Sequence, residues 1–423
     1  MACFMNVIVV AVVVGSVVSG QKELEIDKDE NIEPFALLCR IYNVAKNPPI
    51  NYVDMEEADK IVEEIDALNT SVSEEMSFNE SKQLWNGVDT QNLPTSARET
   101  ALAQASLNQI TQKAHTILDE INKMNLNKAI EKAKAQFSQV IFGENGNETK
   151  LCQATVNDMD NRSKECGMPG EGTKGNSAGK NLVVDFFCLC AMRTESSEGA
   201  KQACGFFVGK IDKYYGWSEQ GPWGSSTMWA SIKGGCGKHM QQHPKSTAEA
   251  RHILDQFLKH LKTGGVYRWG SRNEVKGSKR KAGMLGTGVG EENGVEKGPL
   301  CNGQNGKTGK PPGGVCVYYG PESESWEENI AWLKQFGTAL TSADTINNQI
   351  ATVQRSIQKL HMLLHRAEEI YETAKVITEI QKPEGLATFQ NASGTLTAFN
   401  ATRTRSYSDN PYPYFIPLCV LFL

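Results

Sequence analysis

Several histidines and one cysteine have the spacing of metal ligands. His239 and His243 lie four residues apart, and Cys236 precedes His239 by three, which is the spacing of half a zinc site. A closed zinc site needs four ligands, and no Glu follows His239 to act as a base. His361 and His365 also lie one helical turn apart, but they flank an apolar helical stripe. We therefore predict no metal and no other cofactor, with these histidines facing solvent.

Two further patterns could bind phosphate or polyanions. Gly286-Thr-Gly-Val-Gly290 resembles a phosphate-cradling loop, but no strand pattern leads into it and no helix pattern follows. Lys276 to Lys281 is a short basic run, and we interpret the glycine-rich stretch around it, 264–314, as a mobile surface loop. The sequence has no Gly-x-Ser-x-Gly elbow and no recognisable Cys/His nucleophile arrangement. It predicts neither an enzyme nor a small-molecule substrate; a secreted enzyme would instead need a deep polar pocket.

The cysteines indicate disulfide bonds rather than ligands. Of eleven cysteines, Cys3 and Cys419 lie in the terminal segments, and the other nine cluster mostly between 152 and 316. In a secreted chain such a cluster forms bridges, and an odd number leaves one thiol free or paired between chains. Short loops favour Cys152 with Cys166 and Cys301 with Cys316; the other pairings stay open. The nine candidates are Cys39, Cys152, Cys166, Cys188, Cys190, Cys204, Cys236, Cys301 and Cys316.

Asn-x-Ser/Thr acceptors for N-linked glycans recur along the chain. Asn147 follows a Gly-Glu-Asn-Gly loop, and Asn391 lies in a polar tail, where a bulky glycan fits. A sixth acceptor, Asn400, competes with a second role described below. The predicted glycosylation sites are Asn69, Asn79, Asn147, Asn161 and Asn391.

The N-terminal sequence indicates a secretory signal peptide. An apolar run over 7–18 ends in Val18-Ser-Gly20, with small residues where signal peptidase cleaves. We predict cleavage after Gly20, so that residues 1–20 are removed. The run lacks a preceding Lys or Arg, which leaves an uncleaved membrane anchor as the alternative, although it is shorter than the roughly 20 residues that span a bilayer.

The C-terminus reads as a signal for a glycosylphosphatidylinositol (GPI) anchor. Residues 414–423 are uncharged and apolar, and small polar residues precede them. Ser406 is the first candidate for attachment and Asn400 the second, so that 407–423 would be removed. The alternative is an apolar terminus without any such role.

The formal net charge of −5, with 22% charged residues, argues against a nucleic-acid partner, because a nucleic-acid-binding protein would carry a basic face.

The elements that position these residues are long helices. Apolar residues from Ile346 to Ala374 alternate in steps of four and three, the repeat of a helix buried along one seam. The stretch 95–142 carries a matching stripe with a slip of register near Met124, and 52–85 predicts a third helix. We expect long helices over 95–142 and 323–382 to form an antiparallel hairpin. Residues 143–320 form a lobe inserted between them, with its core in 181–192 and 248–261.

The predicted fold class is therefore mainly α: an elongated antiparallel helical hairpin or bundle with an inserted, disulfide-rich, irregular lobe. The surface domain spans 21–382, and 383–406 form a short stalk. Exposed apolar residues beyond a single seam need cover and so predict a homodimer: Leu118, Leu363, Ile370 and Ile377.

This combination resembles the variant surface glycoproteins of African trypanosomes. The most specific local match is Gly179-Lys-Asn-Leu-Val-Val-Asp-Phe-Phe-Cys188-Leu-Cys190-Ala, which is similar to the Cys-x-Cys segment of the B-type branch, with Cys204-Gly following. The resemblance implies a dimeric, GPI-anchored coat protein on the outer face of the plasma membrane, with host antibodies as partners and antigenic variation as its purpose. Antibodies should then meet 264–314 and 145–175. The alternative is a surface receptor for a host serum protein on the same scaffold.

Overall fold

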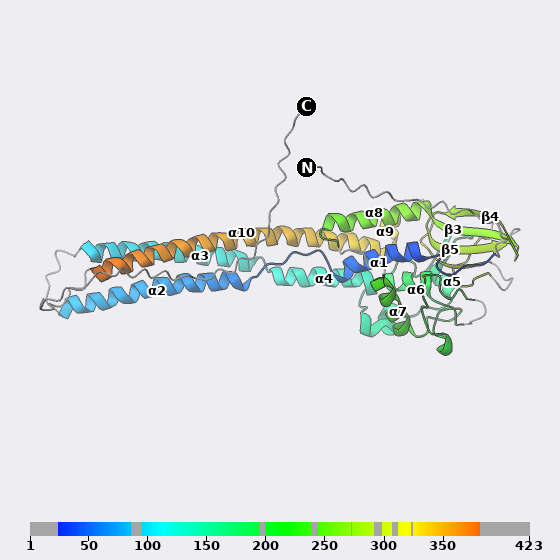
Figure 1. Cartoon of the computed structure of the whole chain (residues 1–423), viewed down its shortest axis with the longest axis horizontal. Helices are drawn as coiled ribbons and strands as arrows, with labels where there is room; N and C mark the ends of the chain where they lie inside the picture. Colours follow the sequence, from blue (N-terminus) through cyan, green and yellow to red (C-terminus); the bar gives the residue numbers. More distant parts are fainter. Residues whose placement is uncertain are drawn as a thin grey trace, which may run out of the picture.

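The protein is an elongated rod with a helical shaft at one end and a folded lobe at the other (Figure 1). The computed structural model describes residues 24–85, 95–194, 199–238, 244–271, 273–291, 298–306, 312–322 and 325–380, with backbone only for 75–85, 95–97 and 378–380. The shaft helices are α2 (Glu56–Trp85), α3 (Thr95–Lys123), α4 (Leu126–Phe142) and α10 (Ala331–Ile380). The lobe contains α1 (Ile32–Lys46), α5 (Arg162–Cys166), α6 (Leu182–Cys190), α7 (Ser225–Lys238), α8 (Thr247–Thr263) and α9 (Trp326–Asn329).

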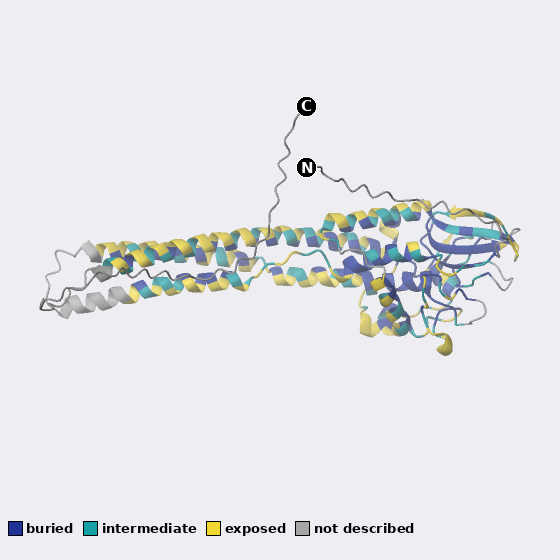
Figure 2. Ribbon diagram, viewed as in Figure 1, coloured by how far each residue is buried: buried dark blue, intermediate teal, exposed yellow. Residues whose placement is uncertain are grey.

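The four shaft helices α2, α3, α4 and α10 share one apolar seam. α10 has 50 residues, begins beside the lobe and ends at the far end of the shaft (Figure 1). Ile350, Val353 and Leu360 of α10 are fully buried, and Ile65 of α2 joins the same core cluster. The seam predicted from the sequence is confirmed, as is the third helix. Figure 2 shows how the seam forms: each shaft helix has a buried stripe that faces the other helices and exposed residues on the opposite side.

The helix predicted over 95–142 is two helices. α3 ends at Lys123 and α4 begins at Leu126. Between them Asn125 has a φ of 47°, in the left-handed region, and its side-chain amide donates to the Lys123 carbonyl at 3.3 Å. Asn enters this region more readily than other non-glycine residues because its short side chain bonds locally. The prediction that the slip leaves the helix unbroken was therefore wrong.

The start of the second long helix was also placed too early. The short helix α9 comes first, and Ile330 follows it in an extended conformation with a ψ of 100°. Only then does α10 begin, at Ala331, and it continues through Gly337.

The lobe is built around α6, every residue of which is buried. The Asn181 side chain caps its first turn by accepting a hydrogen bond from the Val184 amide at 3.0 Å. α8 packs Phe257 against Trp332 at the start of α10, with ring centroids 4.9 Å apart. Both predicted core segments, 181–192 and 248–261, are confirmed. Short helical turns complete the lobe: η1 (Glu148–Lys150), the π-helix η2 (Leu151–Thr155) and η3 (Ile211–Lys213).

A four-stranded sheet forms the end of the lobe farthest from the shaft (Figure 1). Its order is β4-β3-β5-β6, with β3 antiparallel to β4 and parallel to β5, and β5 antiparallel to β6. The strands are β3 (Gly265–Ser271), β4 (Glu274–Lys281), β5 (Met284–Glu291) and β6 (Gly313–Tyr318). A separate two-stranded ribbon pairs β1 (Gly167–Met168) with β2 (Thr173–Lys174).

The prediction of a mobile loop over 264–314 was therefore wrong for the residues of this range that the structure describes, while 272, 292–297 and 307–311 lie outside them. Most of β5 is buried, and its glycines mark close packing instead of flexibility. A Cβ atom at Gly288 would lie 2.4 Å from Pro299, and one at Gly290 would lie 2.3 Å from the Tyr267 hydroxyl. The Gly286-Thr-Gly-Val-Gly290 pattern is thus a packed strand and not a phosphate-binding loop.

Candidate functional site

The lobe is held together by four disulfide bonds. Cα–Cα distances of 5.0–5.6 Å lie in the range that a disulfide permits. Cys301–Cys316 was predicted and is confirmed. Cys39–Cys236 ties α1 to α7 across 197 residues, so Cys236 is not available as a zinc ligand. The four pairs are Cys39–Cys236, Cys166–Cys188, Cys190–Cys204 and Cys301–Cys316.

The predicted pair Cys152–Cys166 was wrong. Cys166 bonds to Cys188, while Cys152 is exposed and is the free cysteine of the described residues. Helix geometry explains why Cys188 and Cys190 have different partners, since residues two apart on a helix point about 200° apart. Cys188 therefore faces Cys166 on one side of α6, and Cys190 faces Cys204 on the other.

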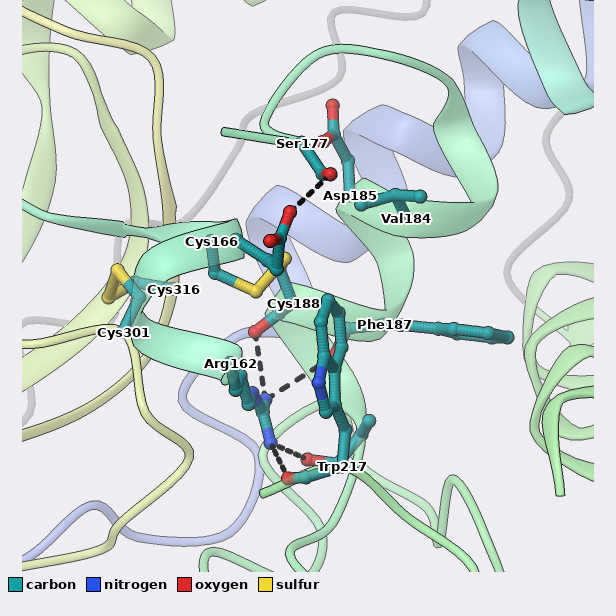
Figure 3. Close-up of a disulfide and its surroundings, with 12 residues drawn as sticks. Arg162, Cys166, Ser177, Val184, Asp185, Phe187, Cys188, Trp217, Cys301 and Cys316 are labelled. Atoms are coloured by element: carbon teal, nitrogen blue, oxygen red, sulfur yellow. Dashed lines mark hydrogen bonds between the residues drawn. A yellow bond between two sulfur atoms is a disulfide. The ribbon is translucent and has the colours of Figure 1, made fainter. Parts of the chain in front are cut away.

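A buried arginine closes the end of α6 (Figure 3). The Arg162 guanidinium donates to the carbonyl oxygens of Ala191 at 2.8 Å, Cys188 at 2.9 Å, Trp217 at 3.2 Å and Phe187 at 3.3 Å. Its side chain is fully buried, and burial, followed by the nearby charge of Arg193, lowers its pKa to about 9. The carbonyl oxygens at the end of the helix offset this cost, because the helix dipole is negative there.

A buried aspartate joins α6 to the rest of the lobe. The Asp185 carboxylate accepts hydrogen bonds from the Gly179 amide at 2.9 Å, the Tyr319 hydroxyl at 2.8 Å and Trp332 Nε1 at 2.6 Å. Burial raises the pKa of Asp185 to about 6, although these donors act in the opposite direction. Neither Arg162 nor Asp185 is predicted from the sequence as a structural centre of the lobe. The available signal was one charge, Asp185, inside an otherwise apolar run.

The predicted glycosylation sites differ in what their amide nitrogen does. Asn147 is exposed, and its oxygen accepts from the Thr149 and Lys150 amides at 3.0 Å, while no described group accepts from its nitrogen. The Asn69 nitrogen donates to Asn108 at 3.0 Å across the contact between α2 and α3, and the Asn161 nitrogen donates to Glu219. The Asn79 side chain and all of Asn391 lie outside the described residues.

No metal centre is found in the described part of the chain, where no group of three or more His, Cys, Asp and Glu residues could hold an ion. His361 Nε2 lies 2.9 Å from Glu57 Oε1, so it pairs α10 with α2. His365 is exposed beside Glu369. His239, His243 and the anchor candidates Ser406 and Asn400 lie outside the described residues, as does the signal segment 1–20. No helix within the described residues combines the length and apolar character needed to cross a bilayer.

An open groove of about 850 Å³ follows the contact between α3 and α10. Ile117 and Leu363 contribute its half-buried apolar surface, and the Met362 side chain is 65% exposed. Lys113, Lys359 and Arg366 surround these apolar residues. The four residues that were predicted to be exposed and to need cover are each partly buried within one chain: Leu118, Leu363, Ile370 and Ile377.

Comparison with known proteins agrees with this architecture. The trypanosomal VSG domain matches residues 13–92 and 78–362 of the chain. Variant surface glycoprotein YnAT 1.3 of Trypanosoma congolense is 25% identical over 248 residues, which are 58% of this chain and 55% of that protein. The chain thus spans about half the length of this curated relative. Because the family match extends over well more than half of the sequence, the chain belongs to the trypanosomal VSG domain family, whose members are cell-surface coat glycoproteins.

Proposed function

We propose that this protein is a GPI-anchored coat protein on the outer face of the plasma membrane, where it shields the cell and evades antibodies by antigenic variation. It has no catalytic role in this proposal. The domain organisation that goes with it is a removed signal over 1–20, a surface domain over 21–382, a stalk over 383–406 and a removed anchor signal over 407–423. Ser406 carries the anchor, with Asn400 as the alternative.

One observation carries the proposal: α10 runs from the lobe to the opposite end of the rod (Figure 1). At about 1.5 Å per residue, its 50 residues span about 75 Å. A lipid attached beyond Ile380 would hold the shaft end at the membrane and place the lobe outward. Narrow rods held at one end pack side by side at high density, which is what a protective coat requires.

The two faces of the groove between α3 and α10 support a homodimer. A monomer exposes Met362 there beside the half-buried apolar side chains of Ile117 and Leu363. A second copy related by a two-fold axis would cover these residues with its own. Met362→Lys places a charge in such an interface, so the variant should be monomeric by light scattering while the wild type is dimeric. A wild type that is monomeric after lipid removal contradicts the dimer.

The anchor and the coat role have separate tests. Phosphatidylinositol-specific phospholipase C should release the wild-type protein from intact cells, and a Ser406→Leu variant should not reach the surface in releasable form. Persistence of the wild type after digestion contradicts the anchor. Surface abundance decides between coat and receptor: a coat protein dominates surface protein by mass, and a minor species that captures one serum protein would establish the receptor alternative.

Antibodies raised against intact cells test which surfaces are outward. We expect them to bind the lobe over 145–175 and the exposed strand β4, since most of the remaining sheet is buried. Antibodies that mainly recognise the shaft over 346–380 contradict an outward lobe.

A further inference from the structure

The outer edge of the sheet carries a concentration of positive charge. β4 is the edge strand in the order β4-β3-β5-β6, and it contains four cations and one acid, Glu274. Lys276, Lys279 and Arg280 are exposed, and Lys281 is half-buried. The formal net charge of the whole chain is −5, so this edge differs in sign from the molecule as a whole. The net charge of the whole chain therefore gives no indication of this local positive charge.

Carboxylates do not neutralise the C-terminal half of this strand. Within the described chain, Lys279, Arg280 and Lys281 form no salt bridge, whereas Arg268 on the neighbouring strand pairs with Glu30 at 2.7 Å. The resulting positive potential contributes to lowering the pKa values of two neighbouring groups, Lys281 and His260. Burial and the charge of Lys279 lower the pKa of Lys281. The pKa of His260 is lowered by burial and by Arg280, against the opposing effect of Glu33.

Aromatic rings hold two of the lysines in place. The Lys279 ammonium lies 5.6 Å from the ring centre of Tyr267 and 5.9 Å from that of Trp269. The Lys281 ammonium lies 5.8 Å from the ring centre of Tyr318. Such cation–π contacts restrict long side chains that would otherwise lose entropy on binding a ligand. Lysines that served only to prevent pairing with the sheet edges of other molecules would not need to be held over aromatic rings.

The spacing fits an extended ligand. Neighbouring residues on a strand are about 3.3 Å apart, so the four cations extend over about 17 Å along this edge strand, with Lys279 and Lys281 on one face, Arg280 on the other and Lys276 at the bulge opposite Trp269 and Gly270. A second protein would be expected to bury apolar anchors, but no described side chain of β4 is an exposed apolar residue. Single-stranded nucleic acid binds through stacking on open aromatic faces, whereas here Tyr267 is 1% exposed and Trp269 is half-buried beneath the Lys279 ammonium.

We propose that β4 is a binding site for linear sulfated polysaccharides, with Lys276, Lys279, Arg280 and Lys281 contacting the sulfate groups. Their charges and the strand spacing supply affinity without a sequence-specific pocket. The site does not depend on the anchor, on dimerisation or on the coat role.

The test is binding of the purified protein to immobilised heparin, with neutral dextran as the blank. Wild-type binding should weaken roughly thirtyfold between 50 and 150 mM salt, as expected when about four cations release counterions from a polyanion. The test variant replaces the four cations of β4 by Gln. The control variant replaces four exposed lysines of the shaft, and both variants change the formal net charge from −5 to −9. The control positions are Lys123, Lys128, Lys132 and Lys134.

We expect the β4 variant to bind heparin at least about tenfold more weakly than the control variant, with unchanged circular dichroism. Lys279→Arg should retain binding, since it keeps the charge over the rings. Equal losses in the two variants would show a general charge effect and overturn the proposal. So would failure of the wild type to bind at 150 mM salt, or tighter binding to single-stranded DNA than to heparin. Self-association of the β4 variant with wild-type heparin binding would show that these charges serve only to protect the edge.

Discussion

Replacing Arg162 by Met tests whether one buried cation holds the end of α6. The substitution keeps an apolar chain of similar length and removes every donor. No other described donor reaches the carbonyl oxygens of Cys188, Ala191 and Trp217. Each unpartnered buried acceptor costs about 1–3 kcal/mol, and three carbonyl oxygens lose their donor. Removing the buried charge also removes its desolvation cost, which offsets part of that sum. We therefore expect a net loss of about 3–5 kcal/mol in the free energy of unfolding.

The assay is urea unfolding of the purified protein, followed by tryptophan fluorescence and by circular dichroism at neutral pH. Arg162→Lys should fall between the wild type and Arg162→Met, because an ammonium offers fewer donors in the wrong geometry. Arg251→Met is the matched control: Arg251 pairs with Asp344 at the surface at 2.6 Å, and its loss should cost less than about 1 kcal/mol. If Arg162→Met lies within about 1 kcal/mol of the control, the capping argument is refuted.

Three further outcomes are expected. The folded-state pKa of Asp185, about 6, lies above its unfolded value, so its contribution to stability is present in acid and is lost as pH rises through 6. Relative to Asp185→Asn, wild type should therefore lose up to about 3 kcal/mol between pH 4 and 8 in urea titrations, and a constant difference would contradict this. Cys166→Ser should destabilise by about 3 kcal/mol, whereas Cys152→Ser should have no measurable effect on the urea midpoint; equal effects would refute the assigned pairing. Mass spectrometry after glycosidase treatment should find Asn147 occupied and Asn161 unoccupied, and the reverse pattern would count against access of the amide nitrogen as the selecting feature.

The pattern of apolar residues is enough to specify the helical shaft. Its apolar residues recur every three or four positions, and a helical period of 3.6 residues converts that spacing directly into one buried face. The seam from Ile346 to Leu360 and the inserted lobe with its core at 181–192 followed from local patterns, and the structure bears them out. The same reasoning placed the third helix beside the hairpin.

The contacts within the lobe, in contrast, depend on how distant segments of the chain meet in space. Cys166 bonds to Cys188 because two chain segments meet there, and no spacing along the sequence encodes which segments meet. The glycines of β5 predict flexibility from the sequence but pack closely in the structure, because a missing side chain looks the same in a loop and in a packed strand. Asn125 likewise ends a helix through its backbone conformation, which its neighbours determine. The charges of β4 became a candidate binding site only once hydrogen bonds to β3 placed them along a single exposed edge, because position in space, rather than composition, decides where charge accumulates.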